Sequence, residues 1–169
     1  IMSCLIVEAF WCKIAGKKNN WNDLSSILTG LLLGLNLPPT SSWWICFIGG
    51  ALAITLGKEV FGGIGYNPFN PALVARVGLL VGFTTPMTSW IRPGVTDGIT
   101  TATPLGMLPT ELSGKADMAW QMCIGNTSGS IGETSALALL IGGIFLVATK
   151  VIKWHIPVSF IGSVAIFTT

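Results

Sequence analysis

Six apolar stretches alternate with short polar segments along the chain of 169 residues. The third stretch, residues 43–61, is long enough to cross a bilayer as a helix. The second, residues 24–37, would reach only about 21 Å as a helix, against a hydrocarbon core of about 30 Å. Because it ends at Pro38-Pro39, we expect a short or broken helix there. The other spans are expected at residues 1–12, 71–90, 134–151 and 155–169.

These stretches favour helices over β-strands. In lipid, backbone polar groups must be paired within the spanning element, and a transmembrane strand would alternate apolar and polar residues, which these stretches do not. We therefore predict an all-α fold, a polytopic membrane helix bundle that forms one membrane domain over residues 1–169. Both ends fall within apolar runs, so we expect the domain to be incomplete there. Gly49-Gly50 and Gly142-Gly143 should allow helices to pack closely.

Composition supports a membrane protein. Hydrophobic residues make up 51% of the chain and charged residues 9%, whereas soluble domains carry about 25% charged residues. The net charge is only +2, and no basic cluster exceeds Lys17-Lys18, which excludes a nucleic-acid-binding surface. The four cysteines form no C-x-x-C pair, so we expect no metal or iron–sulfur site built by this chain alone.

Charge also predicts orientation. If the second stretch crosses the bilayer, one side carries Lys13, Lys17, Lys18, Lys58, Lys150 and Lys153, and the other carries Arg92 and Lys115. The excess places the first side in the cytoplasm. Residues 92–126 would then form an outward-facing loop. If the second stretch re-entered instead, the later spans would invert and the charge distribution would fit less well.

Two polar segments and several charges interrupt this pattern. In "FGGIGYNPFNPA", residues 61–72, glycines relax the backbone, prolines fix it, and Asn67 and Asn70 offer amide groups. Either a bound ligand or a rigid turn between helices explains it. "GNTSGSIGETS", residues 125–135, could bind an anion at a helix amino terminus, or Glu133 could simply cap that helix. We expect Glu8 and the Lys58-Glu59 pair at the membrane interface, and we identify no carboxylate set for Na⁺ or H⁺.

The stretch "DGITTATPL", residues 97–105, carries the most specific chemistry. It resembles the pattern D-x-x-[ST]-x-A-T, at which flavin transferases attach flavin mononucleotide (FMN) to threonine. Asp97, Thr100, Ala102 and Thr103 fill the pattern. Together with "LLLGLNLPP" and "FGGIGYNPFNPA", in this order, the motif resembles the D subunits of Rnf complexes, which are similar to the B subunit of the sodium-pumping NADH:quinone oxidoreductase. Thr101 departs from the family, which often has glycine there.

The resemblance implies a covalent FMN on Thr103 through a phosphoester. It also implies a non-covalent riboflavin, for which Asn67 and Asn70 are the candidate contacts. Arg76, a charge within an apolar stretch, is a weaker candidate; its partner could be a flavin phosphate, a carboxylate or a backbone carbonyl. Glu133 is a second weak candidate. The implied fold is the first half of a two-repeat, urea-transporter-like fold with a broken or short second helix.

The implied function is that of a membrane subunit of an ion-translocating ferredoxin:NAD oxidoreductase complex. It would pass electrons across the membrane between flavoprotein partners, coupled to Na⁺ or H⁺ transport, and it is not expected to be active alone. The implied partners are the other Rnf subunits, including the FMN-bearing G subunit and the C subunit, a flavin transferase for maturation, and the lipid bilayer. The alternative is a solute permease or channel of urea-transporter-like fold without a redox cofactor.

Overall fold

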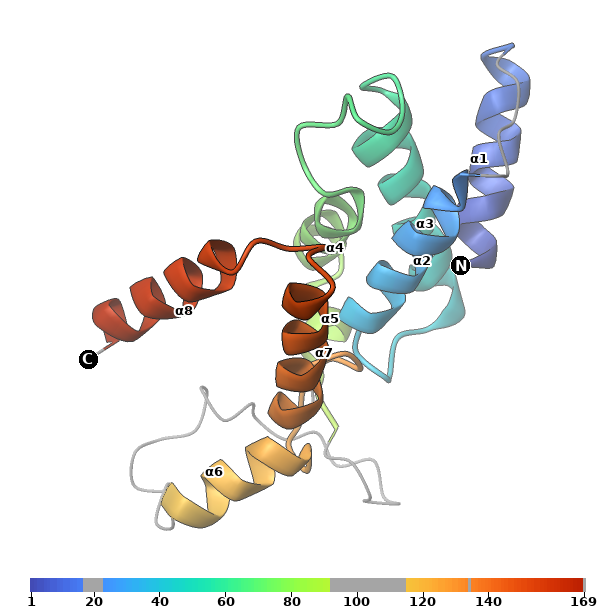
Figure 1. The fold of residues 1–169 in the computed structure, drawn as a ribbon. Coiled ribbons are helices and arrows are strands. Elements are labelled where there is room, and N and C mark those ends of the chain that lie inside the picture. Colours follow the sequence, from blue (N-terminus) through green and yellow to red (C-terminus); the bar gives the residue numbers. More distant parts are fainter. Residues whose placement is uncertain (17–22, 92–114, 134, 169) are drawn as a thin grey trace.

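The structure is a computed structural model that describes residues 1–16, 23–91, 115–133 and 135–168. Within these ranges the chain forms helices and turns but no β-strand, so the all-α prediction is confirmed for them. In chain order the elements are α1 (Met2–Ile14), α2 (Ser25–Asn36), α3 (Trp43–Ile54), the π-helical turn η2 (Thr55–Glu59), α4 (Pro71–Gly82), α5 (Thr84–Thr88), α6 (Lys115–Ile124), α7 (Ala136–Ala148) and α8 (His155–Thr168) (Figure 1).

The residues that interrupt the hydrophobic pattern also set the helix ends. The second stretch forms the short helix α2, which ends just before Pro38-Pro39. The third stretch does not stay α-helical to its end: the Val60 N–H donates to the Thr55 carbonyl at 3.0 Å, which makes the π-helical turn η2. α6 lies within residues 92–126, where we expected a loop. Among the helices of the described ranges, none combines the length and the apolar character that crossing a bilayer requires.

α3 is the centre of a closely packed bundle, because it contacts α1, α2 and α4. Glycines bring these helices together. A Cβ added at Gly49 would lie 2.7 Å from a methyl carbon of Leu79, and one at Gly50 would lie 2.9 Å from the Ser3 Cβ. The prediction of close packing at Gly49-Gly50 is therefore confirmed. The main core cluster, between α2, α3, α4 and α5, consists of Leu33, Leu37, Ile45, Ala53, Ala72, Ala75, Leu79 and Met87.

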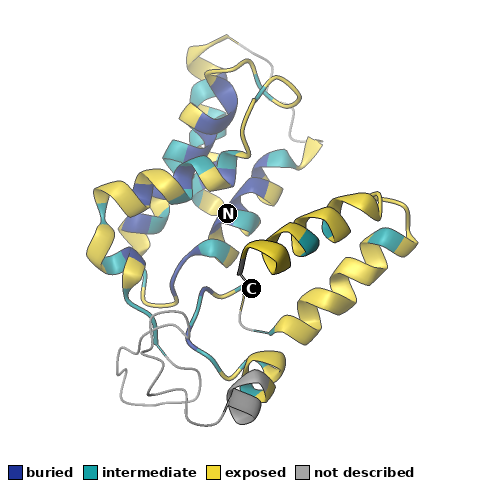
Figure 2. Ribbon diagram, turned by 90° about the vertical axis from the view of Figure 1, so that its left-hand side faces the viewer, coloured by how far each residue is buried: buried dark blue, intermediate teal, exposed yellow. Residues whose placement is uncertain are grey.

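α7 and α8 differ from this bundle, because their apolar side chains are exposed (Figure 2). α7 buries no residue, and no other described helix packs against α8. A Cβ added at Gly142 or Gly143 would meet no described atom within 4 Å. The described part of the chain therefore supplies no neighbour for the close packing that this second glycine pair would allow. An exposed apolar surface of this kind marks contact with lipid or with other protein.

Candidate functional site

The flavin-attachment motif is the first candidate, and the structure does not test it. Asp97, Thr100, Ala102 and Thr103 all lie outside the described residues. The covalent FMN on Thr103 stays a prediction from the sequence.

The second candidate is the segment between η2 and α4, residues 61–70, which we call the asparagine segment. It starts with a turn in which Gly62 and Gly63 have φ values of 108° and 104°, a conformation that glycine adopts easily and other residues rarely do. It ends at Asn70, whose side-chain oxygen accepts a hydrogen bond of 3.0 Å from the Ala72 N–H and so caps α4. Pro71 then begins the helix with a fixed φ. Both ends of the segment are therefore held by specific backbone geometry.

The two asparagines each keep one half of the amide group available. The Asn67 amino group donates to the Phe69 carbonyl at 3.2 Å, and its oxygen has no partner among the described residues. The Asn70 oxygen caps α4, and its amino group has no partner there. Asn67 is half-buried and Asn70 is exposed. One acceptor and one donor on a rigid segment fit the edge of a flavin ring, which alternates carbonyl oxygens with an N–H group.

Arg76, the charge within the fourth apolar stretch, binds a backbone carbonyl. Its guanidinium donates to the Asn36 carbonyl at the end of α2. Of the three partners considered from the sequence, the backbone carbonyl is the one present in the described chain. The contact is electrostatically favourable, because a cation stabilises the carboxyl end of a helix, where the backbone carbonyls lack helical partners. Arginine has five N–H donors, so this contact leaves donors for a further ligand.

The glycine- and serine-rich segment 125–135 also packs against the end of α2. The Gly132 N–H donates to the Leu35 carbonyl at 2.8 Å. A Cβ at Gly132 would lie 2.9 Å from the Leu35 Cβ, so the approach requires glycine. Ser135 caps α7 by accepting from the Ala138 N–H, whereas Glu133 is exposed. The cap that we considered for Glu133 is therefore supplied by Ser135, and the Gly132 N–H is not available to an anion.

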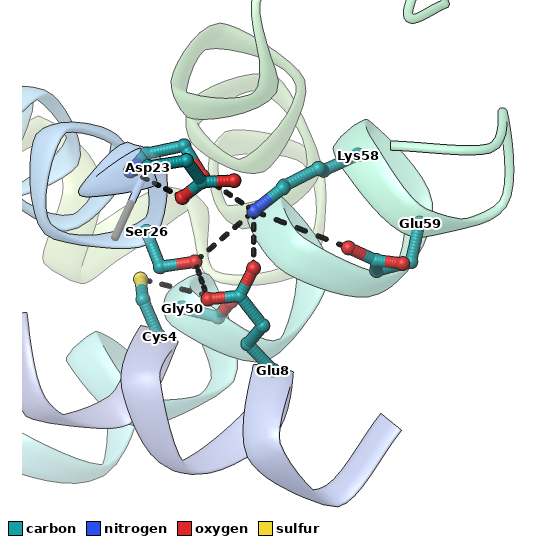
Figure 3. A network of polar contacts seen from close by, with 8 residues as sticks. Cys4, Glu8, Asp23, Ser26, Gly50, Lys58 and Glu59 are labelled. Atoms are coloured by element: carbon teal, nitrogen blue, oxygen red, sulfur yellow. Dashed lines mark hydrogen bonds and ion pairs between the residues drawn. The ribbon is translucent and has the colours of Figure 1, made fainter. Parts of the chain in front are cut away.

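A buried charged group, which the sequence did not identify, lies where α1, α2 and η2 meet (Figure 3). We call it the Lys58 cluster; it consists of Glu8, Ser25, Ser26, Lys58 and Glu59. The Lys58 ammonium forms an ion pair with Glu8 and donates to the hydroxyls of Ser25, at 2.6 Å, and Ser26, at 3.3 Å. The Ser26 hydroxyl also donates to Glu8. The Lys58 side chain is only 4% exposed.

The cluster adds to our placement of Glu8, Lys58 and Glu59 at the membrane interface: within the protein, Lys58 and Glu59 are buried and Glu8 is nearly so. A charge within an apolar stretch was the available signal, and we applied it to Arg76 alone. The partners could not be found from spacing, since Glu8 and Lys58 are 50 residues apart.

Asp23 borders the cluster. Its carboxylate accepts from the backbone N–H of Ser25 at 3.0 Å and from the Ser25 hydroxyl at 2.8 Å. Burial by itself would raise the pKa of Asp23, but these hydrogen bonds outweigh it and leave the pKa below its ordinary value. A cavity of about 80 Å³ beside the cluster is lined by Leu5, Glu8, Asp23, Leu24, Ser26 and Ile27. It is too small for a flavin, since sites for such ligands take about 300–1,000 Å³.

Comparison with known proteins shows which family this chain resembles. The model of the NQR2, RnfD, RnfE family matches residues 1–169, the whole length of the chain. The D subunit of the Na(+)-translocating ferredoxin:NAD(+) oxidoreductase complex of Acetobacterium woodii is 41% identical, over 99% of this chain and 53% of the relative. The D subunit of the proton-translocating ferredoxin:NAD(+) oxidoreductase complex of Clostridium ljungdahlii is 39% identical, over 99% and 54%.

A third relative, the D subunit of the ion-translocating oxidoreductase complex of Alcanivorax borkumensis, is 35% identical, over 98% of this chain and 55% of the relative. The chain therefore spans about half the length of these curated relatives. Two of the relatives are described with different ions, Na⁺ and H⁺.

Proposed function

The chain belongs to the NQR2, RnfD, RnfE family, and we propose from this membership that it is a membrane subunit of an ion-translocating electron-transport complex. The observation that carries the proposal is the identity of 35–41% with D subunits of such complexes over nearly the whole chain. We further propose that it acts as an oxidoreductase only within that complex, beside the G and C subunits. Its place would be the bacterial cytoplasmic membrane, as the first half of a two-repeat fold.

In this proposal the chain holds two flavins. The first is FMN on Thr103: the hydroxyl oxygen attacks the riboflavin-side phosphorus of a flavin dinucleotide donor, the other nucleoside monophosphate leaves, and the hydroxyl proton passes to water, so that a phosphoester forms. Asp97, Thr100 and Ala102 complete the motif that a flavin transferase recognises. A threonine hydroxyl is a poor nucleophile by itself, so attachment requires that enzyme. The tether keeps the cofactor in place, and the redox chemistry is supplied by the flavin when it is bound.

The second flavin is a non-covalent riboflavin at the asparagine segment. The free oxygen of Asn67 and the free amino group of Asn70 support this, because a hydrogen bond within the segment fixes the Asn67 side chain and a hydrogen bond to the first turn of α4 fixes that of Asn70. Arg76 keeps donors for a phosphate or a flavin carbonyl and is a secondary candidate, as is the exposed carboxylate of Glu133. Two flavins on opposite faces of the membrane would let the subunit pass electrons across it.

The experiment that tests the proposal is in-gel fluorescence. The protein is produced together with a flavin transferase, separated on a denaturing gel and illuminated to excite flavin. We expect a fluorescent band that survives denaturation and disappears with Thr103→Val. Thr101→Ala, at a position that the motif leaves open, is the matched control and should leave the band bright. A permease without a redox cofactor would give no band, and mass spectrometry showing an unmodified Thr103 peptide would refute the covalent flavin.

A further inference from the structure

The first turn of the asparagine segment depends on η2. The Gly62 N–H donates to the Glu59 carbonyl at 3.0 Å, and the Gly63 N–H donates to the Lys58 carbonyl at 3.1 Å. The next turn builds on this one, because the Tyr66 N–H donates to the Gly63 carbonyl. The position of the segment therefore follows the position of the Lys58 and Glu59 backbone.

The far end of the segment returns to the same turn. A Cβ added at Gly57 would lie 2.7 Å from the Pro71 Cα, so the first residue of α4 lies directly against η2. Asn70, immediately before Pro71, caps α4. Because the two ends of the segment meet at η2, any displacement of this turn moves both asparagines together.

The side chain of Lys58 attaches η2 to two helices that are distant in sequence. Its ammonium has three N–H donors, and these reach Glu8 on α1 and the hydroxyls of Ser25 and Ser26 at the start of α2. Figure 3 shows the side chains of Glu8 and Ser26 converging on the Lys58 nitrogen. Such contacts from two elements fix the position of the side chain, and with it that of the turn.

We propose that Lys58 is a positioning residue that holds the asparagine segment in the conformation that binds the non-covalent flavin. This inference rests on the proposed function, because it takes the flavin at Asn67 and Asn70 as given. Lys58 acts through the Gly62–Gly63 turn and does not touch the flavin. Glu8 is its main counterpart, since it neutralises the buried ammonium and ties it to α1.

The test uses the assembled complex, purified from cells that supply riboflavin and the flavin transferase. Lys58→Met alone would leave Glu8 buried without a cation, so the informative variant is Glu8→Gln/Lys58→Met, which removes both charges. Lys58→Arg keeps the charge, and Lys13→Met, at an exposed lysine of α1, is the matched control. Flavin extracted by acid is measured against riboflavin added in titration, while the covalent flavin is measured as gel fluorescence.

We expect the double variant to bind riboflavin at least about tenfold more weakly. Removing residues that orient metal ligands without touching the metal weakens metal binding by about that factor. The covalent flavin should stay unchanged, and the thermal unfolding temperature should fall less than in Lys58→Met. Lys58→Arg should recover binding, and Lys13→Met should bind as the parent does. An unchanged affinity in the double variant would overturn the role of Lys58 while leaving the two-flavin proposal intact. A parent complex with gel fluorescence but no extractable flavin would overturn the flavin site at the asparagines, and this role with it.

Discussion

Replacing Gly57 by alanine measures how tightly the base of the asparagine segment is packed. The new Cβ would lie 2.7 Å from the Pro71 Cα, 2.9 Å from its Cβ and 3.2 Å from its carbonyl oxygen. Carbon atoms in contact prefer about 3.5–4.0 Å, so the two backbones must separate by roughly 1 Å. Overpacking of this kind costs about 1–3 kcal/mol. Alanine's better helix propensity returns about 0.5–1 kcal/mol. The midpoints of the two ranges leave a net loss of about 1 kcal/mol in the free energy of unfolding.

Gly34→Ala is the matched control, because the same methyl group is added to a helix in open space. A Cβ at Gly34 has no atom within 4 Å, and the residue is exposed on α2. We expect this variant to raise the free energy of unfolding by about 0.5–1 kcal/mol. Equilibrium unfolding in detergent micelles, followed by the fluorescence of the seven tryptophans, would measure both. If Gly57→Ala unfolded at the same denaturant concentration as the parent or at a higher one, the contact with Pro71 would be refuted.

Three further predictions concern charged side chains. Lys58→Met should lower the free energy of unfolding by about 3–5 kcal/mol, because Glu8 stays buried without its cation. The double variant Glu8→Gln/Lys58→Met should lower it by less, which a double-mutant cycle of unfolding free energies would show. Because the pKa of Asp23 is lowered by folding, its ionised form stabilises the protein above pH 3.8, and this contribution disappears as the pH falls through the folded pKa. The destabilisation caused by Asp23→Asn should therefore shrink in acid unfolding measured below that pH. Arg76→Met should lower the free energy of unfolding by about 1.5 kcal/mol, the lower end for hydrogen bonds to charged groups, because the residue is half-buried. Lys13→Met changes an exposed residue, so its free energy of unfolding should stay within about 0.5 kcal/mol of the parent's.

The positions of the helices could be predicted because their signals are local. Pro38 cannot continue a helix, and α2 ends just before it. Asn70 and Pro71 form a cap and a first helical residue, and α4 begins there. Gly49 and Gly50 predicted a close approach of helices, which is found. The family was also recognisable from short motifs in fixed order, and the resemblance is confirmed.

The Lys58 cluster could not be predicted, because it depends on which distant residues the fold brings together. Nothing in the spacing links Glu8 to Lys58 or to Ser26, which lie on three different elements. The π-helical turn was equally hidden, since η2 continues an apolar stretch that reads as one regular helix. No packed neighbour is found at Gly142 in the described chain for a related reason: a small residue permits close packing but does not supply the neighbour that packs.

The cluster also changes how the charges predict orientation. The positive-inside rule counts lysines and arginines in loops near the membrane, whereas Lys58 lies in a helical turn, buried and paired with Glu8. It should therefore be removed from the count. One side then keeps five cations and the other two, namely Lys13, Lys17, Lys18, Lys150 and Lys153 against Arg92 and Lys115. The excess keeps its sign, so the predicted orientation, with residues 92–126 facing outward, does not depend on Lys58.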